Sequence, residues 1–287
     1  MKILRTIKDA TDFASHERQR GVSIGFVPTM GALHEGHMSL VDRMVSENDV
    51  SVVSIFVNPT QFNNPADLIA YPRTEKEDFA LLAARGVSAV FAPSVEEIYP
   101  EGAKCGERKM FNLGHFAEVM EGIHRPGHFQ GVAQIVSMLF SIINPDTAYF
   151  GEKDFQQIAV IRELIKNEGI NVDIIACPIK RADDGLALSS RNKLLSQEER
   201  NAAPEIYAAL KESIEYSKNN SVRSTHDIVV ERINSIPCMR TEYFEIVDAR
   251  TLMPVEEWEE SPWIVGCITV WCGNTRLIDN ITYRKPE

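Results

Sequence analysis

The stretch Val22–His37, which reads VSIGFVPTMGALHEGH, decides the fold of this chain. Its first six residues are mostly apolar, which predicts a buried strand that closes at Pro28. The loop that follows contains two glycines and leads into a helical pattern over Ser39–Glu47. A strand, a glycine-containing loop and a helix in this order are typical of an open α/β sheet, which binds ligands at the carboxyl ends of its strands.

The same alternation continues along the chain. Val50–Val57 is continuously apolar apart from two serines, as parallel strands buried on both faces tend to be. Further strands are predicted over 87–91, 147–150 and 172–176, and helices over Thr74–Arg85, Phe129–Ile143 and Phe155–Asn167. Thr74 and Glu77 have the spacing of a capping box. This order predicts an α/β fold with a doubly wound, Rossmann-like parallel sheet.

The pattern changes after Cys177. A helix is predicted over Ser196–Lys218, with Ser196 and Glu199 as a capping box, and a second helix near His226–Ser235. Short strands follow over 243–248, 263–270 and 276–280. Helices followed by strands predict a smaller α+β domain. We therefore expect a ligand-binding sheet domain over residues 1–178 and a C-terminal α+β domain over residues 179–287.

Composition excludes several classes of protein. Lys and Arg number 30 and Asp and Glu 41, so the net charge is −11, whereas nucleic-acid binders usually carry a basic domain or stripe. No apolar run reaches the length of about 18 residues that a membrane span requires, and the charged N-terminus carries no secretory signal. The five cysteines are odd in number and have no CxxC spacing, so we expect reduced thiols and a cytoplasmic protein.

The loop Pro28–His37 carries the strongest functional signal. Free backbone N–H groups at the start of a helix attract phosphate, and Gly31 and Gly36 allow a ligand to approach the backbone. His34 and His37 share one face of the helix and can donate hydrogen bonds to a polyphosphate. A loop with two surface histidines is the plain alternative. A zinc site is disfavoured because HExH is one residue shorter than the HExxH zinc motif.

Two further segments follow predicted strands. Neutral amides at Asn58 and Gln61 suit hydroxyl or carboxylate groups of a small substrate, although an Asn-Pro turn that ends a strand is the alternative. In Gly151–Asp154, Lys153 supplies a charge for phosphate. Asp154 suits a helix cap, a ribose contact or the positioning of magnesium. The alternative there is a capped helix start with a solvated lysine.

Two basic segments complete the set of candidates. Ser189–Asn192 offers hydroxyls and a guanidinium on a loop behind Asp183–Gly185, which suits a triphosphate. Arg125 and His128 stand before a helix start and suit phosphate or another anionic group. The alternatives are an ordinary loop that precedes a helix and a basic surface loop. The stretch 101–111, which includes Cys105, fits no motif.

Taken together, these strings resemble the pantoate–β-alanine ligase family, in the nucleotidylyltransferase superfamily whose members carry a HIGH-like motif after the first strand. The resemblance covers roughly residues 20–285 and rests on long, ordered strings. They are PTMGALHEGH at 28–37, FVNPTQF at 56–62, YPRT at 71–74, RPGHFQGV at 125–132, FGEKDFQQ at 150–157 and LSSRN at 188–192.

The resemblance implies an enzyme that condenses pantoate with β-alanine. Pantoate would attack the α-phosphate of ATP, with Mg²⁺ on the phosphates, to give a pantoyl adenylate and pyrophosphate. β-Alanine would then displace AMP. Loop 188–192 resembles the superfamily's KMSKS-like loop, which closes over ATP from the second domain. The family is typically a homodimer through its N-terminal domain.

The resemblance also assigns roles to residues. The ATP-binding set is Met30, Gly31, Ala32, Leu33, His34, Glu35, Gly36, His37, Gly151, Glu152, Lys153, Asp154, Lys180, Leu188, Ser189, Ser190 and Arg191. The pantoate and β-alanine set is Asn58, Gln61, Arg125, His128 and Gln157, and His34, His37, Lys153 and Arg191 would be catalytic. Lys180 stands where a small apolar residue is expected, but that position meets adenine mainly through its backbone. No metal ligands are assigned.

Three other functions stay open from the residues alone. A different nucleotidylyltransferase would need a basic cluster for a second phosphate, which the neutral amides Asn58 and Gln61 disfavour. A non-catalytic nucleotide-binding regulator would bind ATP and have no pocket for the second step. A metal-dependent hydrolase is disfavoured by the HExH spacing.

Overall fold

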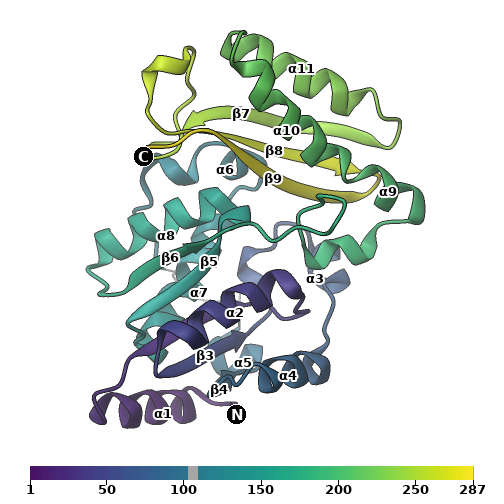
Figure 1. The fold of residues 1–287 in the computed structure, drawn as a ribbon. Coiled ribbons are helices and arrows are strands. Elements are labelled where there is room, and N and C mark those ends of the chain that lie inside the picture. The colour runs from purple at the N-terminus through teal and green to yellow at the C-terminus, as the bar shows by residue number, and fades with distance from the viewer. Residues whose placement is uncertain (103–108, 287) are drawn as a thin grey trace. The chain divides into compact units, whose positions relative to one another are not determined.

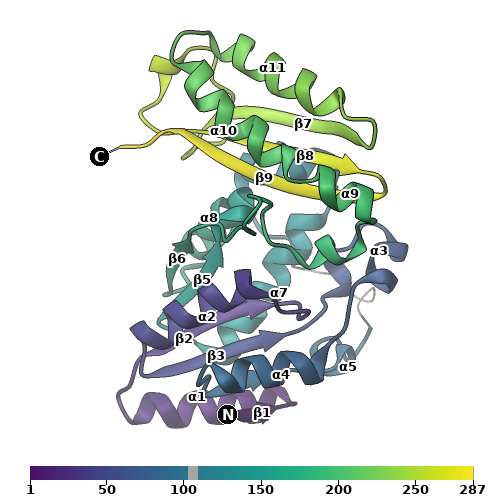
Figure 2. The same ribbon diagram turned by 45° about the vertical axis from the view of Figure 1, so that its right-hand side comes forward.

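The computed structural model describes residues 1–102 and 109–286, so Cys105 and most of the stretch 101–111 lie outside the described residues. By its internal contacts the chain divides into two compact units (Figures 1 and 2). The first unit comprises Met1–Glu152 and Gln157–Pro178. The second comprises Ile179–Glu287 together with the short segment Lys153–Gln156. Each unit has its own apolar core.

A six-stranded parallel sheet forms the first unit, in the order β1-β4-β3-β2-β5-β6. The strands are β1 Lys2–Leu4, β2 Ile24–Thr29, β3 Val50–Ile55, β4 Ala89–Phe91, β5 Thr147–Gly151 and β6 Asp173–Cys177. From β2 the chain builds outward through β3 and β4, then returns to the other side of β2 with β5. The strand order therefore reverses between β2 and β5, where open α/β sheets bind ligands.

Helices cover both faces of this sheet. The helices of this part of the chain are α1 Ile7–Gln19, α2 Glu35–Glu47, α3 Pro65–Ala70, α4 Glu75–Ala84, α5 Val95–Ile98, α6 Glu121–His124, α7 His128–Ile143 and α8 Phe155–Glu168, and α1, α2, α4, α7 and α8 contribute to the cores on the two faces. Successive residues of a strand point to opposite faces, and in β3 Val52 packs into the core that contains α1 and α7, whereas Val53 packs into the core that contains α2 and α4. Burial on both faces explains the continuous apolar run at 50–55.

The second unit contains a three-stranded antiparallel sheet in the order β7-β8-β9. Its strands are β7 Met239–Asp248, β8 Ile264–Cys272 and β9 Thr275–Arg284. Its helices are α9 Gln197–Ala202, α10 Glu205–Ser217 and α11 Val222–Asn234, and α10 and α11 pack against the sheet (Figure 1). The predicted fold class, a Rossmann-like parallel sheet with a smaller α+β domain, is confirmed.

Two predicted elements differ from the structure at a proline. Pro28 does not close its strand, because β2 continues to Thr29 with Pro28 opposite Ser54 of β3. Proline has no backbone N–H to donate to a neighbouring strand. Because β5 pairs with β2 only at Gly25 and Phe26, no hydrogen bond from residue 28 to β5 is required. The single helix expected over 196–218 is split into α9 and α10 around Pro204, whose ring cannot continue a helix interior.

The predicted capping boxes had different outcomes. Ser196 and Glu199 form the expected box at the start of α9. Thr74 precedes α4 as expected, but its side chain makes no cap hydrogen bond to the helix backbone. Its hydroxyl donates instead to the carboxylate of Asp78, 3.1 Å away. That carboxylate is part of the candidate site.

Candidate active site

The loop between β2 and α2 is held by a buried carboxylate. Asp78, in the first turn of α4, is 1% exposed and accepts from the backbone N–H groups of Ala32 and Leu33 at 2.9 and 2.8 Å. Gly31 and Ala32 both have positive φ, +80° and +50°. A Cβ at Gly31 would lie 3.0 Å from Asp78 Oδ2, so this position favours glycine on both counts. The sequence motif thus depends on a residue outside it.

Five backbone N–H groups of this loop already have hydrogen-bond partners within the protein. The amide of Gly31 donates to Thr29 Oγ1, and those of Ala32 and Leu33 donate to Asp78. The amide of His34 donates to the His37 ring, and that of Gly36 donates to the His34 ring. Three of these five donors are satisfied within the segment Thr29–His37, and the other two by Asp78 of α4. In this loop the imidazole Nε2 atoms of His34 and His37 are therefore the donors best placed for a phosphate.

The two histidines form a reciprocal cap at the start of α2. His34 Nδ1 accepts from Gly36 N at 3.1 Å, and His37 Nδ1 accepts from His34 N at 3.3 Å. Their ring centroids are 4.1 Å apart. Because backbone N–H groups can only donate, both Nδ1 atoms are acceptors, and each neutral ring carries its hydrogen on Nε2. The fold therefore fixes two neighbouring imidazoles as Nε2–H donors, and it starts α2 four residues earlier than the Ser39 expected.

Asn58 and Gln61 lie just beyond β3, beside this loop. The Gln61 amide nitrogen lies 3.2 Å from the sulfur of Met30, so the amide segment and the glycine loop are in contact. Asn58 is 1% exposed and donates both to Gln61 Oε1 at 3.1 Å and to the carbonyl of Gly131 in α7 at 3.0 Å. Asn58 thus supports Gln61 from within the core.

Arg125 and His128 also converge on Gln61. His128 Nδ1 donates to the Gln61 carbonyl at 2.9 Å, and Arg125 Nη2 donates to the same oxygen at 3.4 Å. Arg125 Nη1 lies 3.1 Å from His128 Nε2, and Arg125 is paired with Glu121 at 3.5 Å. The structure therefore brings four predicted residues together in the first unit. Asn58, Arg125 and His128 each contact Gln61.

The remaining predicted residues of the first unit lie at its β5–α8 end. Gly151 ends β5, Glu152 begins a short 3₁₀ turn, and Gln157 lies in the first turn of α8. All three are half-buried. Burial is therefore compatible with ligand contact for each, and no predicted residue here is sealed in the core.

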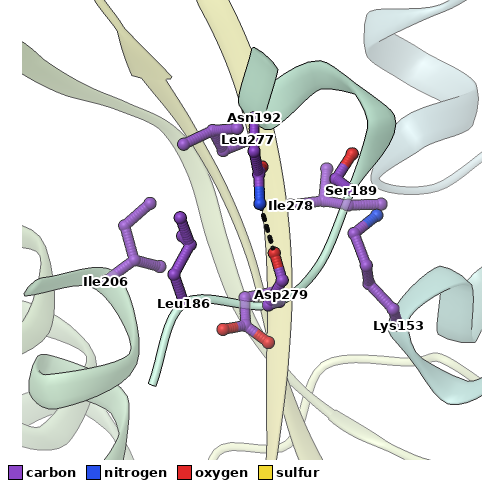
Figure 3. A pocket seen from close by; sticks show the side chains of 9 residues that line it. Lys153, Leu186, Ser189, Asn192, Ile206, Leu277, Ile278 and Asp279 are labelled. Carbon is purple, nitrogen blue, oxygen red and sulfur yellow. Dashed lines mark hydrogen bonds between the residues drawn. The ribbon is translucent and has the colours of Figure 1, made fainter. Parts of the chain in front are cut away.

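In the second unit, Lys153 lines a small pocket with parts of the loop 186–192 and of β9 (Figure 3). Its backbone carbonyl accepts from Asn280 Nδ2 at 3.2 Å, and its side chain extends towards the side of the pocket where Ser189 lies. The other lining residues are Leu186, Ala187, Asn192, Ile206, Leu277, Ile278 and Asp279. Asp154, next to Lys153, is exposed, with its carboxylate 3.9 Å from Lys153 Nζ.

The loop of the second unit is ordered by local hydrogen bonds. Ser189 caps the 3₁₀ turn Ser190–Leu194 by accepting from the amide of Arg191 at 3.3 Å. Ser190 is buried and Arg191 is half-buried. The exposed Lys180 accepts through its carbonyl from Leu188 N at 3.0 Å. Of the second-unit candidates, Lys153 and Ser189 are brought together at one pocket.

One buried ion pair supports this pocket and was not predicted. Arg181 donates to both oxygens of Asp279, at 2.6 and 2.9 Å, and stacks over the ring of Tyr207. Burial raises the pKa of the Asp279 carboxyl, and the hydrogen bonds from Arg181 oppose that rise. No motif marks either residue. Asp78 was also missed, and its only signal was its position after the YPRT string.

Within the part of the chain that the structure describes, no group of three or more His, Cys, Asp or Glu side chains has a geometry that could hold a metal ion. In that same part, no helix combines the length and apolarity needed to cross a bilayer.

Comparison with known proteins places the chain in a family. Residues 2–282 match the family model described as pantoate-beta-alanine ligase. The pantothenate synthetases of Porphyromonas gingivalis and Bacteroides fragilis are 53% and 52% identical, and in each pairing 99% or more of both chains is covered. The crystal structure of pantothenate synthetase from Thermus thermophilus is 40% identical, with a TM-score of 0.92 over 99% of this chain and 100% of that chain.

A second solved structure carries ligands. The pantoate-beta-alanine ligase from Francisella tularensis, complexed with beta-gamma ATP and beta-alanine, is 38% identical, with a TM-score of 0.81 over 100% of this chain and 99% of that chain. The match extends over both units and includes every motif on which the resemblance rested. The chain belongs to the pantoate–β-alanine ligase family.

Proposed function

We propose that this chain is an ATP-dependent ligase that condenses pantoate with β-alanine, through a pantoyl adenylate, to give pantothenate, AMP and pyrophosphate. One observation carries the proposal beyond family membership. The loop with the two Nε2–H imidazoles touches the amide of Gln61 through Met30, at 3.2 Å. A donor pair suited to phosphate and a neutral amide suited to a hydroxy acid thus lie side by side where β2 and β3 end.

The proposed chemistry has two steps. A carboxylate oxygen of pantoate forms a bond to the α-phosphorus of ATP, and the bond from that phosphorus to pyrophosphate breaks. The amine of β-alanine then forms a bond to the acyl carbon, loses a proton, and AMP leaves with the adenylate oxygen. Neither step needs a covalent enzyme nucleophile. Positioning and stabilisation of negative charge are therefore the main tasks of the protein.

Roles follow from the donor chemistry of each residue. His34 and His37 donate hydrogen bonds from Nε2 to phosphate oxygens, and the hydrogen bond from His37 stabilises the negative charge that develops on the leaving pyrophosphate. Lys153 and Arg191 bind phosphate as cations. Gln61 and Gln157 orient pantoate, while Asn58, Arg125 and His128 hold Gln61 in place.

The rest of the ATP-binding set belongs to the same proposal, and it contributes loop backbone and local contacts. These residues are Met30, Gly31, Ala32, Leu33, Glu35, Gly36, Gly151, Glu152, Asp154, Lys180, Leu188, Ser189 and Ser190. Mg²⁺ enters as part of the substrate, because this ion is commonly bound through substrate phosphates with few protein ligands. A homodimer and a cytoplasmic location stay predictions.

An AMP-release assay with each substrate omitted in turn tests this function. AMP should form only when ATP, pantoate and β-alanine are all present, and ATP–pyrophosphate exchange should need pantoate but not β-alanine. A different nucleotidylyltransferase would release no AMP in response to β-alanine. A non-catalytic regulator would gain thermal stability from ATP and none from pantoate, since only a bound ligand stabilises the folded state. Either of those results would contradict the proposal.

A further inference from the structure

We propose that Tyr99 is a positioning residue of this site. Through Asn58 it holds the Gln61 side chain with its amide nitrogen presented to the ligand, so that this nitrogen donates to a hydrogen-bond acceptor of the substrate. The inference rests on the proposed function, because it names the part of the substrate that Gln61 contacts. The relay Tyr99–Asn58–Gln61 lies wholly in the first unit.

The orientation of the Asn58 amide is fixed by backbone groups. The backbone N–H of Thr60 can only donate, and it lies 3.3 Å from Asn58 Oδ1. The carbonyl of Gly131 can only accept, and it lies 3.0 Å from Asn58 Nδ2. Asn58 is 1% exposed, so a flipped amide would oppose like groups at both contacts without water to relieve them. Oxygen and nitrogen are therefore assigned by chemistry at Asn58.

The orientation of Gln61 follows from that of Asn58. The second hydrogen of Asn58 Nδ2 is donated to Gln61 Oε1 at 3.1 Å, which engages the Gln61 oxygen. The Gln61 nitrogen faces the sulfur of Met30 at 3.2 Å, and a thioether is a weak acceptor. A ligand that contacts this nitrogen must offer an acceptor, such as a carboxylate or hydroxyl oxygen of pantoate. The ammonium group of β-alanine, which only donates, is excluded as its partner.

Tyr99 begins the relay from the core side. It is 8% exposed, and its hydroxyl donates to Asn58 Oδ1 at 2.9 Å, the shortest contact of that oxygen. The ring packs against Phe56 at the end of β3, with the centroids 6.2 Å apart. Asn58 Oδ1 also accepts from the hydroxyl of Thr60 at 3.0 Å. Removal of the tyrosine hydroxyl should therefore leave the fold intact and loosen the plane of the Asn58 amide.

The first test is Tyr99→Phe, which deletes one hydroxyl and keeps the ring. The pantoate KM should rise about three- to tenfold, the range expected for one lost hydrogen bond, while the ATP KM stays within about twofold. Tyr283→Phe is the matched control, because it removes the hydroxyl of a half-buried tyrosine that contacts Ser213 at 2.6 Å in the second unit. It should lower stability without a change in the pantoate KM. Equal increases in both KM values for Tyr99→Phe would overturn the relay.

A double-mutant cycle separates the relay from a general loss of stability. In a Gln61→Ala background, Tyr99→Phe should raise the pantoate KM no further, because the group it positions is gone. Additive effects would show that Tyr99 does not act through Gln61. Gln61→Glu preserves the shape but replaces the donor with an acceptor, so it should raise the pantoate KM more than Gln61→Ala. A Gln61→Glu variant that binds pantoate better than Gln61→Ala would contradict the donor assignment.

A spectroscopic test does not depend on turnover. The side-chain amide resonances of Gln61 in ¹⁵N-labelled protein can be assigned by their loss in Gln61→Ala. They should shift in Tyr99→Phe and stay in place in Tyr283→Phe. An unchanged Gln61 resonance in Tyr99→Phe would refute the relay even in an active enzyme. If wild-type protein releases no AMP but the resonance shifts, the proposed function fails and the relay stands.

Discussion

Replacement of Asp78 by asparagine should weaken the hydrogen bonds that hold the loop between β2 and α2, which carries His34 and His37. The two oxygens of Asp78 accept from Ala32 N, from Leu33 N and from the Thr74 hydroxyl, at 2.9, 2.8 and 3.1 Å. Asparagine keeps the size of the side chain but offers one oxygen only. Its amide hydrogens would face one of the two backbone N–H donors, at a site that is 1% exposed.

The expected loss of stability follows from these contacts. A buried hydrogen bond to a charged group contributes about 1.5–3 kcal/mol, and a buried donor left without a partner costs about 1–3 kcal/mol. Asp78→Asn should therefore lower the free energy of unfolding by about 3–5 kcal/mol. That is a large part of the total of about 5–15 kcal/mol typical of folded domains, but it leaves the protein folded at room temperature.

Urea unfolding followed by fluorescence measures this loss, with the midpoint and slope fitted separately. Asp42→Asn is the control, because Asp42 is an exposed carboxylate paired with Arg85 on the surface, and such pairs contribute about 0–1 kcal/mol. Under conditions where Asp78→Asn is folded, its pantoate-dependent ATP–pyrophosphate exchange should also fall, since His34 and His37 follow the loop. A variant as stable as Asp42→Asn would refute the claim that this carboxylate holds the loop.

Three further outcomes are expected. Gly131→Ala would place a Cβ 2.5 Å from the carbonyl oxygen of Thr60. It should therefore lower the free energy of unfolding in urea by about 1–3 kcal/mol and raise the pantoate KM. Wild-type values of both quantities would contradict the close approach of the two backbones. His37→Ala should keep the fold by circular dichroism and lose about 10²-fold or more in exchange rate; unchanged exchange would exclude His37 from the first step. Although burial opposes ionisation, hydrogen bonds led by Arg250 hold the pKa of Asp248 at about 2, below its unfolded value of 3.8. Its stabilisation, about 1–2 kcal/mol, should be present above about pH 4 and lost as pH falls towards 2, and urea unfolding of Asp248→Asn between those values should lack this dependence.

Local patterns predicted the fold well where burial repeats along the chain. The apolar run at 50–57 and the helix at 129–143 were found because each buries a regular face. Element ends were less predictable when they depended on partners. Pro28 is tolerated in its strand because β5 pairs with β2 only at Gly25 and Phe26, and no feature near Pro28 in the sequence encodes that register. The helix α1 was not assigned, because its apolar residues are sparse among charges.

The sequence predicted which residues belong to the candidate site, but it did not predict the hydrogen bonds between them. Asn58, Arg125 and His128 were expected to meet substrate, and the structure shows that each of them also forms a hydrogen bond to Gln61, which the sequence did not predict. Sequence patterns show which side chains follow a strand or precede a helix, but hydrogen bonds between distant segments depend on how the strands are ordered. Asp78 illustrates the limit, because it is one acidic residue among several in the first turn of α4, and only its burial distinguishes it.

The net charge of −11 raises the question of how this protein binds anionic substrates near Gln61. Both proposed substrates of the first step are anions, and a simple prediction is that free cations gather around them. At Gln61, however, Arg125 lies 3.5 Å from Glu121 and His128 is bonded to a backbone carbonyl, so this part of the site is nearly balanced in charge. We therefore propose that the oriented dipole of the Gln61 amide recognises the substrate there. Dipoles held by a buried relay need no reorganisation when a substrate arrives, which is how fixed donors stabilise charge in an active site. An acidic protein can therefore bind a small carboxylate by holding one amide rigidly, with the cations of this part of the site serving as its supports.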